Sequence, residues 1–231
     1  MFNEVTKSIR VLCASAVEKA NSGHPGMPLG MAEVGTVLFK EFLNVTPEKP
    51  DWINRDRFVL SAGHGSMLLY SLLHFNGFDL TMEDVKKFRQ LNSKTPGHPE
   101  YSSKEGIDTT TGPLGQGFAN GVGMALAERY LSEKLGEDVI NHHVYGIVSD
   151  GDLMEGVSTE AAELAGTWGL GKIIYFFDNN NISIDGFVEK VSITNQKSKF
   201  ESMGWHVLEI DAHNYDQIIS SITEAQSNLS K

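Results

Sequence analysis

The second half of the sequence alternates regularly between short apolar runs and helical patterns, and this alternation leaves few folds open to the chain. Apolar runs at residues 143–148, 173–177 and 205–210 predict strands. Helical patterns occupy residues 157–168, about 195–203 and 215–228. Strands that alternate with helices favour a parallel sheet joined by right-handed crossovers. We therefore expect an α/β fold, with a parallel sheet that carries helices on both faces.

The first half follows the same scheme less regularly. Helices are expected at residues 5–20, 31–42 and 116–135, and a short strand at 57–61 leads into a helix through Leu72 and Leu73. A capping-box pattern at 81–84 predicts a helix to about Leu91. Residues 92–111 are rich in Pro, Gly, Ser, Thr and His, which predicts a loop that is either functional or disordered. Without any internal repeat, residues 1–231 are expected to form one domain.

Charge and cysteine content exclude several classes of protein. Thirty acidic residues against nineteen basic ones give a net charge of −11, which argues against nucleic-acid binding. No apolar run approaches the length that spans a membrane, and the first ten residues lack the apolar core of a signal peptide. The single cysteine, Cys13, lies in an apolar helical pattern and is expected to be a buried thiol. We expect a cytoplasmic protein without nucleic-acid or membrane partners.

Two polar loops directly follow predicted strands. Residues 149–156 follow the run at 143–148, and residues 178–186 follow the run at 173–177. Ligands of doubly wound sheets collect at such strand ends, and hard oxygen donors suit Mg²⁺ or Ca²⁺. The Asp150 carboxylate, the Asn180 amide oxygen and the Ile182 backbone carbonyl form a candidate metal site, where Gly151 allows close approach of a phosphate. Either loop alone reads more simply as a turn; the pair favours a metal site.

The spacing of these loops is similar to the fingerprint of thiamine-diphosphate enzymes, which is Gly-Asp-Gly followed some two dozen residues later by Asn-Asn. Asp150-Gly151 and Asn179-Asn180 match it, with Ser149 in place of the first glycine. The chain most resembles transketolases, from about residue 3 to its end. The resemblance rests on further segments: Gly23-His24-Pro25-Gly26, Gly63-His64-Gly65-Ser66-Met67, Thr95-Pro96-Gly97-His98-Pro99, residues 109–117, Leu153-Met154-Glu155-Gly156 and residues 182–186.

This resemblance implies thiamine diphosphate as cofactor, held through Mg²⁺, with Ca²⁺ or another divalent ion as alternatives. Asp150, Asn180 and Ile182 would hold the ion. The residues implied in cofactor binding are His64, Gly112, Pro113, Leu114, Gly151 and Asn180. The glycine-rich loop also precedes a long predicted helix, whose N-terminus is a ready anion site.

The resemblance further implies the transketolase reaction of the pentose phosphate pathway, in which a ketose phosphate donates a two-carbon ketol unit to an aldose phosphate. His24 and His98 would line the substrate channel and move protons, for which histidine is suited near neutral pH. Glu155 would lie at the interface of a homodimer, with Glu160 as a weaker candidate. Five histidines match no motif and are expected to be structural or solvated: His74, His142, His143, His206 and His213.

Two alternatives remain open. Deoxyxylulose-phosphate synthase shares the metal motif, although residues 109–117 favour transketolase. An isolated, non-catalytic cofactor-binding fragment is the other, because the family takes its activating glutamate from a separate pyrimidine-binding domain. That domain has no counterpart in these 231 residues, and the family's diphosphate domain continues further. We therefore expect a fragment of a longer enzyme that is inactive alone, and favour this over the small subunit of a naturally split enzyme.

Overall fold

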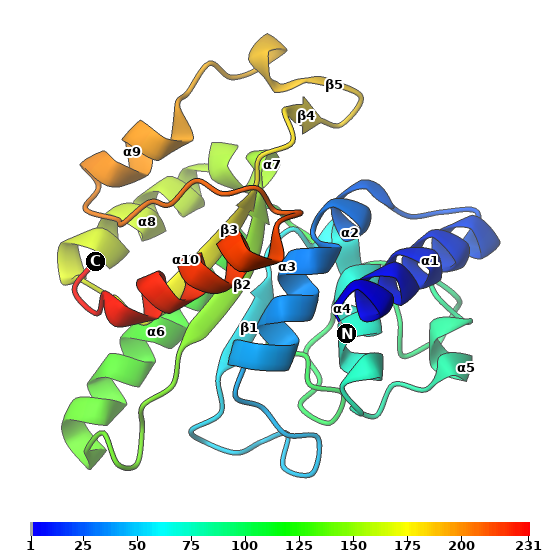
Figure 1. Ribbon diagram of the computed structural model, residues 1–231, viewed down its shortest axis with the longest axis horizontal. Coiled ribbons are helices and arrows are strands. Elements are labelled where there is room, and N and C mark those ends of the chain that lie inside the picture. Colours follow the sequence, from blue (N-terminus) through cyan, green and yellow to red (C-terminus); the bar gives the residue numbers. More distant parts are fainter. Residues whose placement is uncertain (1) are drawn as a thin grey trace.

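The computed structural model describes residues 2–231, and its centre is a parallel three-stranded sheet (Figure 1). The strands are β1 (Arg57–Leu60), β2 (Val144–Ser149) and β3 (Ile173–Asp178), with β2 in the middle. Leu60 is paired with Ile147, and Ser149 is paired with Asp178. The carboxyl ends of the three strands therefore lie at one edge, where the sequence placed its polar loops.

Helices and short turns surround this sheet. The helices are α1 (Phe2–Ala20), α2 (Gly26–Gly30), α3 (Ala32–Val37), α4 (Ser66–Phe75), α5 (Met82–Val85), α6 (Gln116–Leu135), α7 (Asp150–Met154), α8 (Gly156–Trp168), α9 (Gln196–Ser202) and α10 (Tyr215–Ser227). A π-helical turn η1 (Leu38–Phe42) extends α3, and the 3₁₀ turns are η2 (Gly63–Gly65) and η3 (Val188–Lys190). A short antiparallel pair, β4 (Ile182–Ser183) and β5 (Gly186–Phe187), follows β3.

Alternate residues of β2 enter two different hydrophobic clusters. Val144 and Val148 pack with residues of α6 and α8, whereas Tyr145 and Ile147 pack with residues of α1, α3, α4 and α10. Successive side chains of a strand point to opposite faces, so each face is covered by its own helices. The expected α/β architecture with helices on both faces is confirmed.

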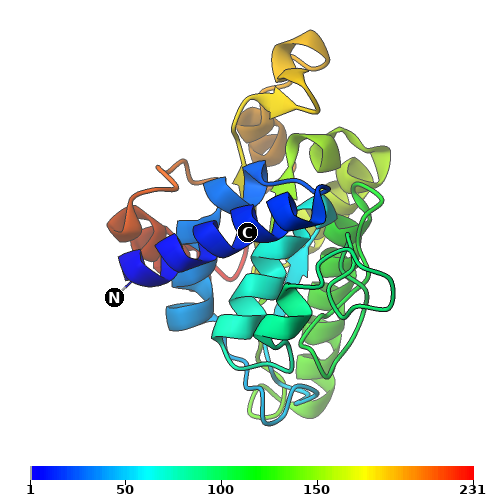
Figure 2. The ribbon, with the colours of Figure 1, turned by 90° about the vertical axis from the view of Figure 1, so that its right-hand side faces the viewer.

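The segment between β3 and α10 packs against these clusters only through partly buried side chains, such as Phe200, Met203 and Trp205. Within residues 179–217, all of which the structure describes, no side chain is buried. Figures 1 and 2 show the β4–β5 hairpin standing clear of the body. At its tip Ile184 is fully exposed and adopts a left-handed backbone with φ of 58°, an unusual conformation for a β-branched residue.

Two expected elements are wrong. Residues 205–210 form no strand, and Trp205 is held instead by its Nε1–H, which donates to the Ala162 carbonyl at 2.9 Å. An alternating apolar pattern indicates only that the side chains are partly buried. Side chains of an irregular segment can be partly buried in the same way. The helix expected to Leu91 ends at Val85, although its Thr81–Asp84 capping box is present. Arg89 then turns left-handed with φ of 61° and donates its N–H to the Thr95 carbonyl.

Long-range hydrogen bonds order the loop at residues 92–111. The Tyr70 hydroxyl donates to the Pro96 carbonyl, the Ser66 hydroxyl donates to the Gly97 carbonyl, and the Thr111 N–H donates to the Pro99 carbonyl. This anchoring holds the segment around His98 against the start of α4. None of the helices among residues 2–231 combines the length and apolarity that crossing a bilayer requires.

Candidate functional site

The loops after β2 and β3 meet at the carboxyl edge of the sheet. Asp150 is the first residue of α7 and Asp178 the last of β3, and both are buried. Burial raises the pKa of Asp150, and the nearby Asp178 carboxylate raises it further. Burial also raises the pKa of Asp178, against a lowering by its hydrogen bond with Asn180. Two carboxylates in so confined a space repel each other, and a bound cation would offset that cost.

Asn180 lies beside this pair with a defined orientation. Its Nδ2–H donates to Asp178 Oδ2 at 3.0 Å, and its Oδ1 accepts the Ile182 N–H at 2.9 Å. The second lone pair of Oδ1 remains for a ligand. The donor set of carboxylate, amide oxygen and backbone carbonyl fits a divalent ion such as Mg²⁺. The described residues contain no group of three or more His, Cys, Asp or Glu side chains that could hold a metal ion, so an ion here would depend on the amide and backbone oxygens as well.

His24 and His64 lie close together. Their ring centroids are 5.2 Å apart in an edge-to-face arrangement. Burial lowers the pKa of His64, and repulsion from His24 and His98 adds to this, against a raising by the Asp152 carboxylate. Burial likewise lowers the pKa of His98, with further contributions from Arg89 and His24. The three motif histidines, distant in sequence, thus share one neighbourhood.

The glycine-rich loop closes against both groups. A Cβ added at Gly112 would lie 3.2 Å from the His98 ring, and one at Gly151 would lie 3.0 Å from Leu114. Gly112 has a φ of 145°, which only glycine adopts readily. Pro113 and Leu114 are exposed on this loop. The glycine-rich loop therefore contacts residues 149–156, called the metal loop below, through Leu114. It contacts the histidines through Gly112.

Two amides at the N-terminus of α6 are already bonded within the protein. The Phe118 N–H donates to Ser61 Oγ, and the N–H of Gly115, which caps the helix, donates to Asp152 Oδ1, each at 2.9 Å. These amides bond protein side chains and are not free for an anion.

Sequence reasoning assigned no role to Asp152 or Asp178. Asp152 is wholly buried and caps α7 through Ser149. The Ser149-x-x-Asp152 spacing of a capping box was the available signal. Asp178 had none, because its position opposite Ser149 is a matter of strand register. Glu155, the N-cap of α8, and Glu160 within α8 are exposed. Glu155 is also next to Gly115, where an added Cβ would lie 2.8 Å from the Glu155 Cβ.

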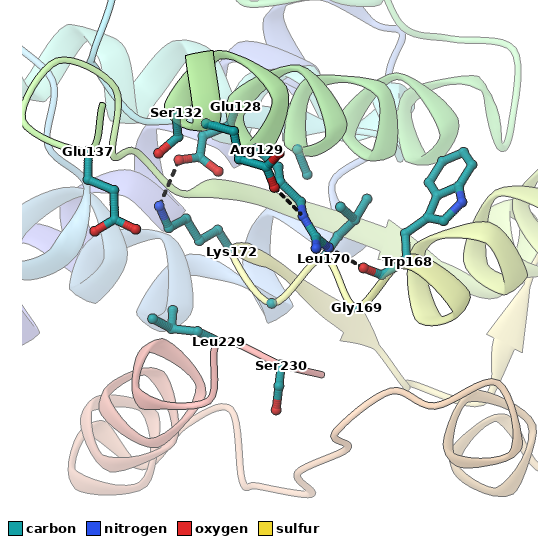
Figure 3. Close-up of a pocket in the computed structure, with 13 residues that line it drawn as sticks. Glu128, Arg129, Ser132, Glu137, Trp168, Gly169, Leu170, Lys172, Leu229 and Ser230 are labelled. Carbon is teal, nitrogen blue, oxygen red and sulfur yellow. Dashed lines mark hydrogen bonds and ion pairs between the residues drawn. The ribbon is translucent and has the colours of Figure 1, made fainter. Parts of the chain in front are cut away.

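Figure 3 shows a hollow of about 450 Å³ that lies away from this site. It is lined by the C-terminal half of α6, by residues 168–172 before β3 and by Leu229 and Ser230. Lys172 Nζ pairs with Glu128 Oε1 at 2.7 Å there, and Arg129 donates to the Trp168 carbonyl. Because residues 168–172 precede β3, the hollow lies at the amino end of the sheet and takes no part in the candidate site.

Residues 2–231 match the family model described as the thiamine diphosphate binding domain of transketolase. Transketolase 1 of Pasteurella multocida is 53% identical over 232 residues, which cover 99% of this chain and 35% of that protein. Transketolase of Bacillus subtilis is 54% identical over 228 residues, which cover 97% of this chain and 34% of that protein.

Solved structures give the same result. Transketolase of Campylobacter jejuni superimposes with a TM-score of 0.96 at 48% identity, covering 99% of this chain and 36% of that one. Transketolase of Pichia stipitis, in complex with sedoheptulose 7-phosphate, superimposes with a TM-score of 0.96 at 46% identity, covering 100% of this chain and 35% of that one. The chain spans about a third of the length of these relatives. It belongs to the transketolase family and corresponds to the thiamine diphosphate binding domain of that family.

Proposed function

We propose that this chain is a single diphosphate- and metal-binding domain of a cytoplasmic, homodimeric transketolase. The whole enzyme would transfer a two-carbon ketol unit from a ketose phosphate to an aldose phosphate. The observation that carries the proposal is the buried Asp150–Asp178 pair with Asn180 beside it, at the strand ends of a transketolase-family domain. The relatives compared above are transketolases, which favours this activity over that of deoxyxylulose-phosphate synthase.

Asp150, Asn180 and the Ile182 carbonyl would hold Mg²⁺. The ion would bind the cofactor diphosphate against Gly151 and the loop of Gly112, Pro113 and Leu114. Support comes from the fixed Asn180 amide and from the contact between Gly151 and Leu114. Bound thiamine diphosphate supplies an electron sink for breaking a carbon–carbon bond beside a carbonyl.

The histidines would handle the protons of the sugar. Lowered pKa values leave His64 and His98 neutral near pH 7. A neutral imidazole has one ring nitrogen that accepts a proton and one that donates. His98, together with His24, would exchange protons with hydroxyl and carbonyl oxygens of the substrate, while His64 would contact the cofactor. Glu155, exposed at the start of α8, would lie at the dimer interface.

Sugar phosphates are the proposed substrates. Among the structural neighbours, Pichia stipitis transketolase has been solved with sedoheptulose 7-phosphate and, as an R356L mutant, with fructose 6-phosphate. The longer enzyme should turn over xylulose 5-phosphate with ribose 5-phosphate. Turnover of pyruvate with glyceraldehyde 3-phosphate alone would instead indicate a synthase and overturn the proposal.

Calorimetry tests the cofactor half directly. Thiamine diphosphate titrated into the chain with Mg²⁺ should give a binding signal that a chelator removes. The Asp150→Ala variant should give none, whereas Asp138→Ala, on an exposed loop, should bind like the wild type. Equal heats for the wild type and Asp150→Ala would refute the metal assignment.

A further inference from the structure

The Asp152 carboxylate accepts hydrogen bonds from three separate segments of the chain. Its Oδ1 accepts from Ser61 Oγ at 2.8 Å and from the Gly115 N–H at 2.9 Å. Its Oδ2 accepts from the Ser149 N–H at 2.9 Å and from Ser149 Oγ at 3.0 Å. The side chain is wholly inaccessible to solvent. A buried carboxylate with this many donors is fixed in position, and its bonds are stronger than those between neutral groups.

The three segments are those that would surround the cofactor diphosphate. Ser61 directly follows β1 and precedes the turn with His64. Gly115 ends the glycine-rich loop, and Ser149 directly precedes Asp150. Ser61 extends the network, because its Oγ also accepts the Phe118 N–H at 2.9 Å. One side chain thus ties together the turn with His64, the glycine-rich loop and the metal loop.

We propose that Asp152 is a positioning residue, which holds the glycine-rich loop at a fixed place relative to the metal loop so that both reach one diphosphate. Asp152 does not touch the cofactor; it acts through Gly115 and Ser149. The inference rests on the proposed function, since it names how the cofactor-binding loops are held. Carboxylates that orient ligand-bearing groups from outside the site commonly raise metal affinity by about 10- to 100-fold.

Asparagine has nearly the same shape as aspartate but cannot take its place. Each carboxylate oxygen of Asp152 accepts one backbone N–H, from Gly115 on one side and from Ser149 on the other. An amide offers one acceptor oxygen and one NH₂ group, so one backbone N–H would face another donor. Asp152→Asn should therefore release either the glycine-rich loop or the start of α7.

Asp56 provides a matched control. Its carboxylate is also buried and also bridges two backbone amides, with Oδ2 accepting the Asn44 N–H and Oδ1 the His143 N–H, each at 2.7 Å. It lies before β1, at the opposite end of the sheet from the candidate site. Asp56→Asn therefore tests whether any loss of a buried bridging carboxylate has the same effect.

The dissociation constant of thiamine diphosphate with Mg²⁺ separates a positioning role from a structural one. We expect Asp152→Asn to raise it at least about tenfold. Asp56→Asn should lower the melting temperature but change the dissociation constant less than about twofold. Unchanged affinity in Asp152→Asn, or an equal loss in both variants, would overturn the proposal. If Asp152→Asn does not fold, Ser61→Ala removes one donor of the network and should weaken binding in the same direction; unchanged affinity there would also overturn it.

Amide hydrogen exchange tests the same inference without any cofactor. In Asp152→Asn the Gly115 or the Ser149 amide should exchange at least about tenfold faster, while the Ile147 amide in β2 keeps its protection. Equal rates in both proteins at Gly115 and Ser149 would overturn the positioning role. If the wild type takes up no cofactor, the proposed function fails for this chain, and the exchange rates still decide the role of Asp152.

Discussion

Asp178 sets the orientation of Asn180: the Asn180 amide group donates to the Asp178 carboxylate at 3.0 Å, and its oxygen then faces the Ile182 N–H. A free asparagine side chain can present either its oxygen or its nitrogen to a ligand. Only the oxygen binds a cation, so the neighbour that selects the rotamer contributes to the metal site.

Replacing Asp178 should therefore weaken metal binding. In Asp178→Asn two amides face each other, and the Asn180 oxygen is no longer selected. We expect the Mg²⁺ dissociation constant, measured with thiamine diphosphate present, to rise about tenfold. Asp185→Asn removes the same charge from an exposed position of this loop and should change it by less than about threefold. An equal effect of both variants would mean that charge alone matters.

Removing a charge from the buried pair should stabilise the metal-free protein. Burial raises the pKa of Asp150, and repulsion from the Asp178 carboxylate raises it further. Asp150→Asn should raise the free energy of unfolding by about 0.5–2 kcal/mol without metal while it weakens Mg²⁺ binding. Chemical denaturation with a chelator measures the first effect. A destabilised variant would contradict this explanation.

Acid should destabilise the fold through His142. Burial lowers the pKa of His142 to about 4, helped by repulsion from Arg57 and Arg55, and its buried Nδ1 has no hydrogen-bond partner among the described residues. A folded-state pKa below the unfolded value means that stability is lost as the pH falls from about 6.5 to about 4. Burial raises the pKa of Asp56 to about 6. The contribution of Asp56 to stability therefore has the opposite pH dependence and increases as the pH falls from about 6 toward 4.

His142→Gln isolates the histidine contribution. The variant should lose the contribution of His142, so its unfolding free energy at pH 4 relative to pH 7 should be higher than that of the wild type by up to about 3 kcal/mol. Urea denaturation at several pH values gives this difference. An unchanged pH dependence would show that His142 does not drive acid unfolding.

Tyr175 packs in space that Gly121 and Gly146 leave open. Its ring stacks on Phe118 at 4.5 Å, and a Cβ at Gly121 would lie 2.0 Å from its hydroxyl oxygen. Gly121→Ala should lower the free energy of unfolding by about 1–3 kcal/mol through overpacking. Gly123→Ala, on the exposed side of α6 with no atom near its added Cβ, should raise it by about 0.5–1 kcal/mol. Calorimetric melting of both variants checks the opposite signs.

Features of the fold that depend on hydrophobic periodicity and on the ends of parallel strands could be predicted from the sequence. The sheet, most helices and the adjacency of the loops at Asp150 and Asn180 follow from alternation and from the geometry of parallel strands. Asp178 could not be singled out, because its partnership with Asn180 depends on the strand ending at residue 178. For Asp152 the sequence offered only the capping box with Ser149, because Ser61 and Gly115 come to its carboxylate only in the folded chain.

The ligands of the candidate metal site come from two parts of the chain that are buried to different degrees. Asp150 follows the central strand of the sheet, whereas Ile182 belongs to a stretch without any buried side chain. An ion bound by both residues would fix the β4–β5 hairpin to the body of the protein. Part of its binding free energy would then offset the lost mobility of the hairpin, so shortening or stiffening the turn at residues 184–185 should change cofactor affinity while Ile182 stays in place.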